Sequence, residues 1–447
     1  RLSVMKGEMR GAIEEKLANG LAAEIPVLTR REIRLPQIPG KAVAVVGMRR
    51  SGKTSFLWQC LSDLLKSGAR RETLLYVNFE DDRLAGVDAS VLSYLLEAYY
   101  RLYPGVRERE TLTLFLDEIQ LVKGWETFVR RILDSENVRV FLSGSSARML
   151  SREVATSMRG RAVEVAVYPF SFREVLAHRG ESPGKPWGLL PKGDRSGAEY
   201  AFVRYLNVGG FPEAQGLELR DHRLLMQSYV DVAVLRDVIE RHAVSNPIAL
   251  RWLQRHLLSA PAAPFSIQKF YDALRSQGLP VSKDTLHAYL SHFEDAFLLR
   301  TTSMLSASER QRMVNPRKAY PIDPGLIPLY ERMGRGNVGQ SLETAVLVEL
   351  LRRGCEVHYL RTAGGHEVDF HAVDAMGRVI LVQVCADVSD LSTFEREVRA
   401  LVEAHQSHPK AQPVLIVHNP LPNAVEVPEF VEVKHAVQWF LEDPVVH

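Results

Sequence analysis

The sequence predicts an α/β fold divided into several domains, and three observations support this prediction. Four short apolar segments rich in β-branched residues, at 41–47, 73–80, 111–118 and 138–145, alternate with helical segments, which is typical of a parallel sheet covered by helices. A loop rich in glycine and proline follows at 180–197, and strands dominate again after residue 336. At about 100–200 residues per domain, the 447 residues of the chain suffice for two to four domains.

The composition is that of a globular protein. Hydrophobic residues make up 46% and charged residues 25%, and 56 Lys and Arg against 54 Asp and Glu leave a net charge of +2. This balance argues against a protein that coats nucleic acid with its whole surface, but it allows one basic module. Three scattered cysteines without a CxxC pair exclude a disulfide framework and favour a cytoplasmic setting. All apolar runs are far shorter than the roughly 18 residues of a membrane span, so no membrane partner is expected.

A phosphate-binding loop is predicted between the first strand and the next helix. Residues 1–40 are predicted as a helical lead-in, and the strand at 41–47 then runs into GMRRSGKT, which fits G-x-x-x-x-G-K-[ST] at every fixed position. Glycine lets backbone N–H groups turn toward phosphate oxygens, and the helix N-terminus attracts anions. Lys53 is expected to reach the β- and γ-phosphates of a nucleotide, and Thr54 to bind Mg²⁺. The expected nucleotide contacts are Gly47, Arg49, Arg50, Ser51, Gly52, Lys53, Thr54 and Ser55.

Two adjacent carboxylates, Asp117 and Glu118, end the apolar segment LTLFLDE. Such a pair at the end of a buried strand is costly unless a cation or a water network uses it. Asp117 is therefore predicted to hold Mg²⁺, and Glu118 to orient and polarise the water that attacks the γ-phosphate. The pair favours hydrolysis over nucleotide binding alone, the alternative being two solvated acids at a surface strand end.

A serine and an arginine complete the predicted catalytic set. Three serines end the next strand, Ser143, Ser145 and Ser146, and Ser145 is the candidate for a contact with the γ-phosphate or the attacking water. Arg161, in SMRGRAVEV, is the main candidate for an arginine that stabilises charge on the γ-phosphate of a neighbouring subunit, while Arg159 and Arg236 are further candidates. A plain loop serine and a surface ion pair are the alternatives.

The ordered motifs GMRRSGKT, FLDEIQ, FLSGSSA, GRAVEVAVYPFSFREV, GGFPEA and LRDVIERHAVSN resemble the prokaryotic AAA-type ATPases related to the signal-transducing STAND ATPases. The resemblance covers nearly the whole chain. It implies an AAA+ core at 41–180, a helical lid at 196–245, a winged helix at 246–325 and a nuclease-like domain at 336–447. It also implies ATP rather than GTP, and no NKxD-type guanine motif is present in the sequence.

The order of elements after residue 246 predicts a winged helix-turn-helix. Three helices at 248–259, 267–276 and 283–297 precede two strands that form a wing, and residues 241–320 carry 11 basic and 5 acidic side chains, a net charge of +6. DNA is therefore the expected partner of this segment. Packing between domains or subunits is the alternative use of the module. The candidate DNA contacts are Lys283, Thr285, His287, Arg310, Arg312, Arg317 and Lys318.

The C-terminal segment resembles the PD-(D/E)xK nucleases, with a restriction-endonuclease-like α/β fold. Glu343 lies on a predicted helix, and a hairpin centred near residue 376 sets Asp369 opposite Gln383 and Glu367 opposite Cys385. The second acid position of the pattern holds the neutral Gln383, and the lysine position holds Cys385. The site is therefore predicted to be degenerate, and nuclease cleavage is not expected.

These features predict an ATP-hydrolysing motor or remodeller that acts on duplex or branched DNA. The domain order is similar to that of Holliday-junction branch-migration motors, and the AAA+ resemblance implies a homo-oligomer such as a hexameric ring. The first alternative is a STAND-like switch in which ATP controls assembly, with the winged helix as a packing module. The second alternative is an ATP-gated DNA nuclease.

Overall fold

In a computed structural model the chain forms two compact units, Arg1–Val167 and Tyr168–His447. The structure describes residues 2–144, 158–306, 308, 315–331, 338–421 and 426–442. Ser145, Arg310 and Arg312, three predicted site residues, lie outside the described residues. Among the helices of the described residues, none has both the length and the apolar character that crossing a membrane requires.

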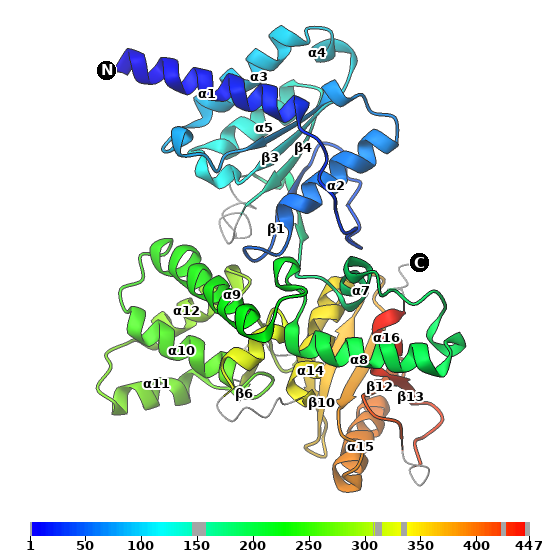
Figure 1. Ribbon diagram of the computed structural model, residues 1–447. Helices are drawn as coiled ribbons and strands as arrows, with labels where there is room; N and C mark the ends of the chain where they lie inside the picture. Colours follow the sequence, from blue (N-terminus) through cyan, green and yellow to red (C-terminus); the bar gives the residue numbers. More distant parts are fainter. Residues whose placement is uncertain are drawn as a thin grey trace. The chain divides into compact units, whose positions relative to one another are not determined.

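The first unit is built on a parallel sheet of five strands in the order β2-β3-β4-β1-β5 (Figure 1). The strands are β1 (Ala42–Val46), β2 (Leu74–Asn78), β3 (Leu112–Asp117), β4 (Val138–Ser143) and β5 (Ala162–Ala166). All residues of β1 and β3 are buried, as expected for central strands with helices on both faces. The predicted parallel α/β sheet is therefore confirmed.

Helices connect these strands, and the longest of them pack around the sheet. They are α2 (Lys53–Lys66), α3 (Ala89–Leu102), α4 (Val106–Arg109) and α5 (Trp125–Ser135), with single 3₁₀ turns at Arg71–Thr73, Asp82–Leu84 and Ile119–Leu121. The parallel register sets Asn78 beside Asp117 and Val45 beside Ser143. The carboxyl ends of β1, β3 and β4 consequently meet at one edge of the sheet, where ligands bind in open α/β folds.

The predicted helical lead-in at 1–40 is only half helical. The helix α1 (Leu2–Ala22) contacts β2 and α3, and residues 23–38 then run without helix or strand. Prolines at 26, 36 and 39 lack the backbone N–H that a helix interior needs, which explains the early end. The buried Arg31 in this segment donates a hydrogen bond of 2.9 Å to the carbonyl oxygen of Ser51, so the segment braces the phosphate-binding loop.

The second unit contains a mixed sheet of five strands in the order β13-β12-β11-β10-β9 (Figure 1). The strands are β9 (Glu356–Arg361), β10 (Glu367–Val373), β11 (Val379–Cys385), β12 (Gln412–Val417) and β13 (Glu432–His435). Strands β9 to β11 are antiparallel, and β11 to β13 are parallel. Phe370 lies opposite Val382, which confirms the predicted hairpin register.

Two helices cover opposite faces of this sheet. Buried residues of α14 (Val338–Arg352) share a core with Phe370 and Val382, whereas those of α15 (Leu391–Ser407) share a core with Leu381 and Leu415. The first core also receives α7 (Phe172–Arg179), α8 (Lys192–Val208) and α16 (Ala436–Leu441). Helix α7, predicted within the ATPase core at 41–180, and helix α8, predicted within a helical lid at 196–245, thus both pack against the C-terminal sheet. Phe172, Phe202 and Tyr205 are fully buried against the C-terminal sheet and cannot leave it without exposing large apolar surfaces.

The GGFPEA motif forms a tight connection inside the second unit. Gly209 has φ = 77°, and a Cβ atom there would lie 1.7 Å from an Asp323 oxygen. The Asp323 carboxylate accepts hydrogen bonds from the backbone N–H of Gly210, at 2.7 Å, and of Gly325, at 2.9 Å. Burial raises the pKa of Asp323 to about 6, although both N–H groups favour its charged form. The motif therefore serves packing within this unit.

A smaller group of helices and three short strands completes the second unit. These are α9 (Leu219–Val232), a π-helix (Ala233–Glu240), α10 (Pro247–Ser259), β6 (Pro264–Phe265), α11 (Ile267–Ser276), α12 (Lys283–Asp295), β7 (Leu299–Thr302) and β8 (Arg317–Pro321), with 3₁₀ turns at Trp187–Leu189, Pro212–Ala214 and Pro324–Leu329. The strands form an antiparallel sheet in the order β6-β8-β7, in which β6 was not predicted. Ser266 and Ser282 cap α11 and α12 through their side chains.

Candidate functional site

The loop between β1 and α2 has the backbone of a phosphate cradle. Gly47 has φ = 154°, and a Cβ atom there would lie 2.3 Å from the carbonyl oxygen of Val167. Gly52 has φ = 99° immediately before α2, and Arg50 adopts the left-handed conformation with φ = 65°. Only glycine fits the first position, and the turn directs backbone N–H groups toward the N-terminus of α2.

The interior of this loop holds a buried lysine and a buried serine. The ammonium group of Lys53 donates hydrogen bonds to the carbonyl oxygens of Gly47, at 3.1 Å, and Met48, at 3.0 Å. The Ser51 Oγ is fully buried and has no hydrogen-bond partner among the described residues. A buried hydroxyl of this kind costs free energy unless a ligand satisfies it. The loop therefore fits a phosphate group, with Lys53 supplying the positive charge.

Hydroxyl groups surround the Asp117 carboxylate. Thr54 Oγ1 donates to Asp117 Oδ2 at 2.8 Å, the Tyr76 hydroxyl donates to the same oxygen at 2.7 Å, and Ser143 Oγ donates to Oδ1. Asp117 is completely buried, whereas Thr54 is exposed on the loop side. The structure thus brings together the two residues predicted to hold Mg²⁺. Hydroxyl and carboxylate oxygens are the hard ligands that this ion prefers, so the residues fit it.

Tyr76 is a hydrogen-bond donor to Asp117 that the sequence did not predict. It is an interior residue of β2, and its ring lies 4.2 Å from that of Trp58. Burial and the neighbouring Asp117 raise the pKa of the Tyr76 hydroxyl, so it stays a proton donor to the carboxylate. Tyr76 lies two residues before the end of β2, and β2 pairs with the strand that ends in Asp117. This position near the strand end was the one signal in the sequence for the contact.

Glu118 occupies a special backbone position at the same edge. Its φ is 56°, in the left-handed region that glycine favours, and its backbone N–H donates to Ser143 Oγ at 3.3 Å. The Glu118 carboxylate accepts a hydrogen bond from the Gln120 side chain. Non-glycine residues in this region are concentrated at functional sites because the surrounding structure must hold them there.

The remaining predicted catalytic residues differ in their positions. Ser143 contacts Asp117, whereas Ser145, the serine predicted to contact the γ-phosphate or the attacking water, lies outside the described residues. Arg161 lies at the start of β5, beside Ala42 at the amino edge of the sheet, and forms an ion pair with Asp134. The amino edge is the opposite end of the strands from the phosphate loop. Arg161 therefore does not contact the nucleotide site of its own chain.

A second group of charged residues lies in the second unit. Lys318 of β8 is 3% exposed, and its ammonium nitrogen lies 2.8 Å from Glu367, 3.2 Å from Glu343 and 3.8 Å from Asp369. Burial opposes the charge on this amine, yet the carboxylates of Glu343, Asp369 and Glu367 raise the pKa of Lys318 above its ordinary value. Burial raises the pKa of Glu343 and of Asp369 as well. We call Lys318, Glu343, Glu367 and Asp369 the carboxylate cluster.

The carboxylate cluster corrects two predictions. Lys318 is not a DNA contact of an exposed wing, because it is buried among acids. Cys385 does not occupy the lysine position, since its thiol lies in the apolar core beneath α15, where burial raises its pKa to about 11. Gln383 does approach Asp369, whose backbone N–H donates to the Gln383 side-chain oxygen at 3.2 Å. The amine that contacts these acids therefore comes from β8.

The other candidate DNA contacts lie on α12 and β8. Lys283 and His287 are exposed on α12, and the Lys283 ammonium lies 5.3 Å from the centre of the Tyr271 ring. The Thr285 hydroxyl is within 2.8 Å of Ser282 Oγ at the helix cap, so it is already engaged. Arg317 is partly buried beside β6.

Comparison with known proteins agrees with the first unit. Residues 39–176 match the model of a family described as AAA domain, and residues 199–334 match a domain of unknown function (DUF8612). The parallel sheet, the phosphate loop and this match define a P-loop ATPase of the AAA class, which binds and hydrolyses ATP. The chain is 31% identical over 383 residues to the uncharacterized protein MJ1544 of Methanocaldococcus jannaschii, over 84% of this chain and 81% of that protein, and it belongs to the same family.

Two further similarities are weaker. An uncharacterized protein of Haemophilus influenzae is 28% identical over 400 residues, which cover 89% of this chain and 94% of that protein. Among solved structures, the Walker-type ATPase PABY2304 of Pyrococcus abyssi aligns with a TM-score of 0.41 at 15% identity, over 72% of this chain and 94% of that chain.

Proposed function

We propose that this AAA ATPase is a motor or remodeller that acts on duplex or branched DNA as a homo-oligomer, with a degenerate nuclease-like domain used for binding or assembly. The observation that carries the ATP-driven part is the meeting of Lys53, Thr54, Asp117 and Glu118 at one edge of the parallel sheet. In this proposal Lys53 binds the β- and γ-phosphates, and Glu118 activates water. Thr54 and Asp117 hold Mg²⁺, which neutralises phosphate charge when it is bound.

The second unit offers a surface suited to DNA. Its elements α10, β6, α11, α12, β7 and β8, with the sheet order β6-β8-β7, have the order and pairing of a winged helix. A groove of about 1070 Å³ is lined by Arg255, Lys269, Trp252 and Phe270, among others. Basic groups beside aromatic rings suit a phosphate backbone and stacked bases. Since Lys318 is buried, this groove and the exposed Lys283 are the expected contacts among the described residues.

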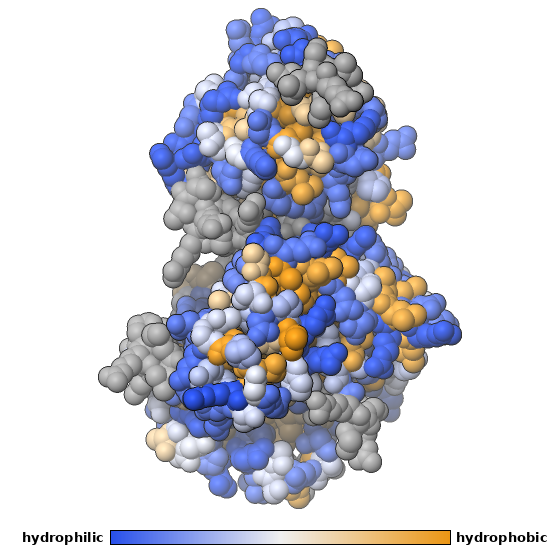
Figure 2. All heavy atoms as spheres, turned by 90° about the vertical axis from the view of Figure 1, so that its left-hand side faces the viewer, coloured by the Kyte–Doolittle hydropathy of each residue, from blue (hydrophilic) through white to orange (hydrophobic). Residues whose placement is uncertain are grey.

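Assembly into an oligomer has support in the apolar surface of the second unit. Leu224 and Val232 of α9, Leu235 of the π-helix and Ile248 of α10 are between 42% and 63% exposed. Figure 2 shows apolar side chains gathered on the face of this unit that bears these helices. Extended apolar patches of this kind mark contact surfaces. Arg161, at the amino edge of the first unit, is the residue we propose to complete a neighbour's ATP site.

The carboxylate cluster supports a degenerate nuclease-like domain. The order α14, β9, β10, β11, α15, β12 and the mixed sheet support this part of the proposal, in which Glu343 and Asp369 would take the acid positions. The Lys318 ammonium lies among the carboxylates that would otherwise bind a metal ion. Asp369 Oδ2 accepts from the Val384 N–H at 2.9 Å, and the Gln383 amide donates to Glu397. With their ligand atoms engaged by the protein, these residues are expected to cut no DNA.

The DNA proposal is tested by ATP hydrolysis rates with duplex, single-stranded and four-way junction DNA, together with binding at several salt concentrations. We expect at least one of these DNAs to stimulate ATP hydrolysis. Arg255→Ala and Lys269→Ala should each reduce the slope of log binding constant against log salt concentration by about one. The exposed Lys410→Ala, in the loop before β12, is the matched control. Absence of both stimulation and salt-sensitive binding would reject the DNA partner without touching the ATPase assignment.

A STAND-like nucleotide switch is the second candidate function. One observation favours it: β8 uses Lys318 to join the winged-helix-like elements to the C-terminal sheet, which is a packing role. The switch predicts tightly retained nucleotide, very slow turnover and rates that do not respond to DNA. The same hydrolysis assay therefore distinguishes the two candidates.

A further inference from the structure

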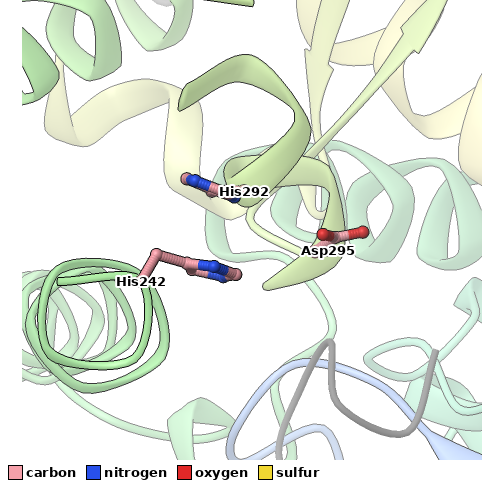
Figure 3. A group of neighbouring side chains, drawn as sticks. All are labelled: His242, His292 and Asp295. Atoms are coloured by element: carbon pink, nitrogen blue, oxygen red, sulfur yellow. The ribbon is translucent and has the colours of Figure 1, made fainter. Parts of the chain in front are cut away.

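Two histidines and an aspartate meet where the π-helix segment contacts α12. His242 follows the π-helix, and His292 and Asp295 lie one helical turn apart on α12. One ligand atom from each side chain lies within 4.8 Å of the other two. The imidazole rings of His242 and His292 lie face to face, with centroids 3.6 Å apart and an angle of 11° between their planes. Figure 3 shows the two stacked rings with the Asp295 carboxylate beside them.

The neighbouring groups leave Asp295 as the acid of this cluster. The adjacent Glu294 accepts hydrogen bonds from the backbone N–H of Thr301, at 3.0 Å, and from its hydroxyl, at 2.7 Å. Arg300 donates to the Glu294 carbonyl and lies 3.9 Å from the centre of the Phe297 ring. Arg241 and Arg300 contribute positive charge near Asp295, while Glu294 contributes negative charge. Asp295 makes no hydrogen bond or ion pair of its own with the described residues.

The geometry of the two histidines suits a metal ion. Both residues are partly buried, and their rings lie face to face at a stacking distance. The Nδ1 atom of His292 is buried without a hydrogen-bond partner among the described residues. Neutral imidazole nitrogen is the form that binds metal ions. Because buried polar atoms are nearly always hydrogen-bonded, the unsatisfied nitrogen of His292 is a candidate ligand for a metal ion.

We propose that His242, His292 and Asp295 form a binding site for Zn²⁺. Two nitrogen ligands and one carboxylate oxygen are a ligand set that this ion uses, with water in the fourth position. Ligands at zinc distances lie roughly 3.4 Å apart in a tetrahedral site, so the three groups must close by on the order of 1 Å and the rings must rotate out of their stack. Side-chain rotation about the Cβ–Cγ bond of each histidine provides that movement.

The site would fix one helix to another. Ala243, directly after His242, has φ = 47°, so the chain changes direction immediately after His242. The partner helix α12 also carries the exposed Lys283 and His287. Bound zinc would therefore set the orientation of α12 relative to the π-helix segment, independently of the ATP site and of any DNA contact.

The test is a titration of the untagged, chelator-treated full chain with Co²⁺, followed by visible absorption and displacement by Zn²⁺. We expect one Co²⁺ per chain, with ligand-field bands typical of four or five ligands, and affinity at least about tenfold weaker in His292→Ala and Asp295→Asn. His287→Ala, which removes an exposed histidine of the same helix, should bind as the wild type does.

Thermal unfolding guards against a variant that fails to fold. Zn²⁺ should raise the Tm of the wild type and of His287→Ala but not of His292→Ala or Asp295→Asn, each compared with its own metal-free form. Absence of stoichiometric Co²⁺ binding, or equal binding in the His292 and His287 variants, would overturn the proposal. The readouts do not involve ATP, so they remain valid if the DNA function is wrong.

Discussion

The phosphate loop and the carboxylate cluster contain the same kinds of residues and use them in opposite ways. In the loop, Lys53 is held by two carbonyl oxygens, and Asp117 is held separately by three hydroxyls. In the cluster, the lysine contacts the acids directly, at 2.8 to 3.8 Å. These carbonyl oxygens and hydroxyls carry no net charge, so their hydrogen bonds position the first lysine and the first acid without neutralising them.

This difference separates a site that is ready for a ligand from one that is complete. A lysine held by neutral carbonyl groups keeps its attraction for phosphate, and a carboxylate held by hydroxyls keeps its attraction for a cation. Once lysine and acids have paired in a buried place, separating them costs several kcal/mol, so neither is available to a ligand. The predictions below test this contrast from the largest expected effect to the smallest.

Replacing the proposed water-activating acid should have the largest effect. Glu118→Gln removes the base and leaves the phosphate loop intact, so the hydrolysis rate should fall by about 10² to 10⁴-fold while ATP binding is retained. Single-turnover hydrolysis and nucleotide binding measure the two quantities. The exposed Glu108→Gln, in α4, serves as the control, and a full rate in Glu118→Gln would show that another group activates the water.

Breaking the carboxylate cluster should cost stability. Lys318→Met leaves the buried Asp369 and the partly buried Glu343 and Glu367 without their cation, which should lower the free energy of unfolding by about 3–5 kcal/mol at neutral pH. The loss should shrink as the pH falls toward the ordinary carboxyl pKa of about 4, because protonated acids need no cation. Denaturant unfolding at several pH values measures it. If Lys318→Met instead unfolds as the exposed Lys283→Met does, the cluster is not a buried ion pair.

Asp323 sharpens the contrast because it is a buried acid held by backbone N–H groups. Asp323→Ala leaves the N–H groups of Gly210 and Gly325 unsatisfied and should cost about 2 kcal/mol. Since burial raises the pKa of Asp323 to about 6, folding favours its protonated form. Its contribution to stability is greatest below the unfolded pKa and decreases as the pH rises toward 6. The decrease in unfolding free energy between about pH 4 and pH 6 should therefore be smaller in Asp323→Ala, as measured by denaturant unfolding at several pH values. An unchanged pH dependence would show that another group causes it.

The smallest effect is expected from the hydroxyls around Asp117. Tyr76→Phe removes one of the three donors, which is worth about 1 kcal/mol, so the Mg²⁺ concentration for half-maximal hydrolysis should rise by a few-fold. Tyr103→Phe, at the end of α3, is the control. An equal change in both variants would mean that Tyr76 acts only through packing.

The nucleotide site was predictable because its signals are local. The pattern that contains Lys53 and Thr54 specifies a turn between a strand and a helix, and the strand that ends in Asp117 carries its own apolar pattern. Parallel pairing then brings the strand ends together without further information. The role of Tyr76 required knowing that β2 lies beside β3, which the chain order alone does not determine.

The carboxylate cluster was not predictable in the same way. Lys318 is separated from Glu343 and Asp369 by 25 and 51 positions, and it belongs to a different sheet. The one available signal was its place in RKAYP, where the neighbouring Ala319 and Tyr320 are apolar and buried. The sequence also placed Glu367 and Asp369 on the same face of the sheet as Cys385. The pairing of β10 with β9 shifts register between Val368 and His371, and simple alternation along a strand cannot show such a bulge.

The most direct test compares the two buried lysines by the Mg²⁺-dependent rate of ATP hydrolysis. Lys53→Met should lose activity by about 10² to 10³-fold, because the phosphates lose their fixed positive charge. Lys318→Met, measured where it remains folded, should retain the wild-type rate within about twofold, since its lysine is already paired with acids. Retained activity in Lys53→Met, or an equal loss in both variants, would contradict the distinction between an open site and a complete one.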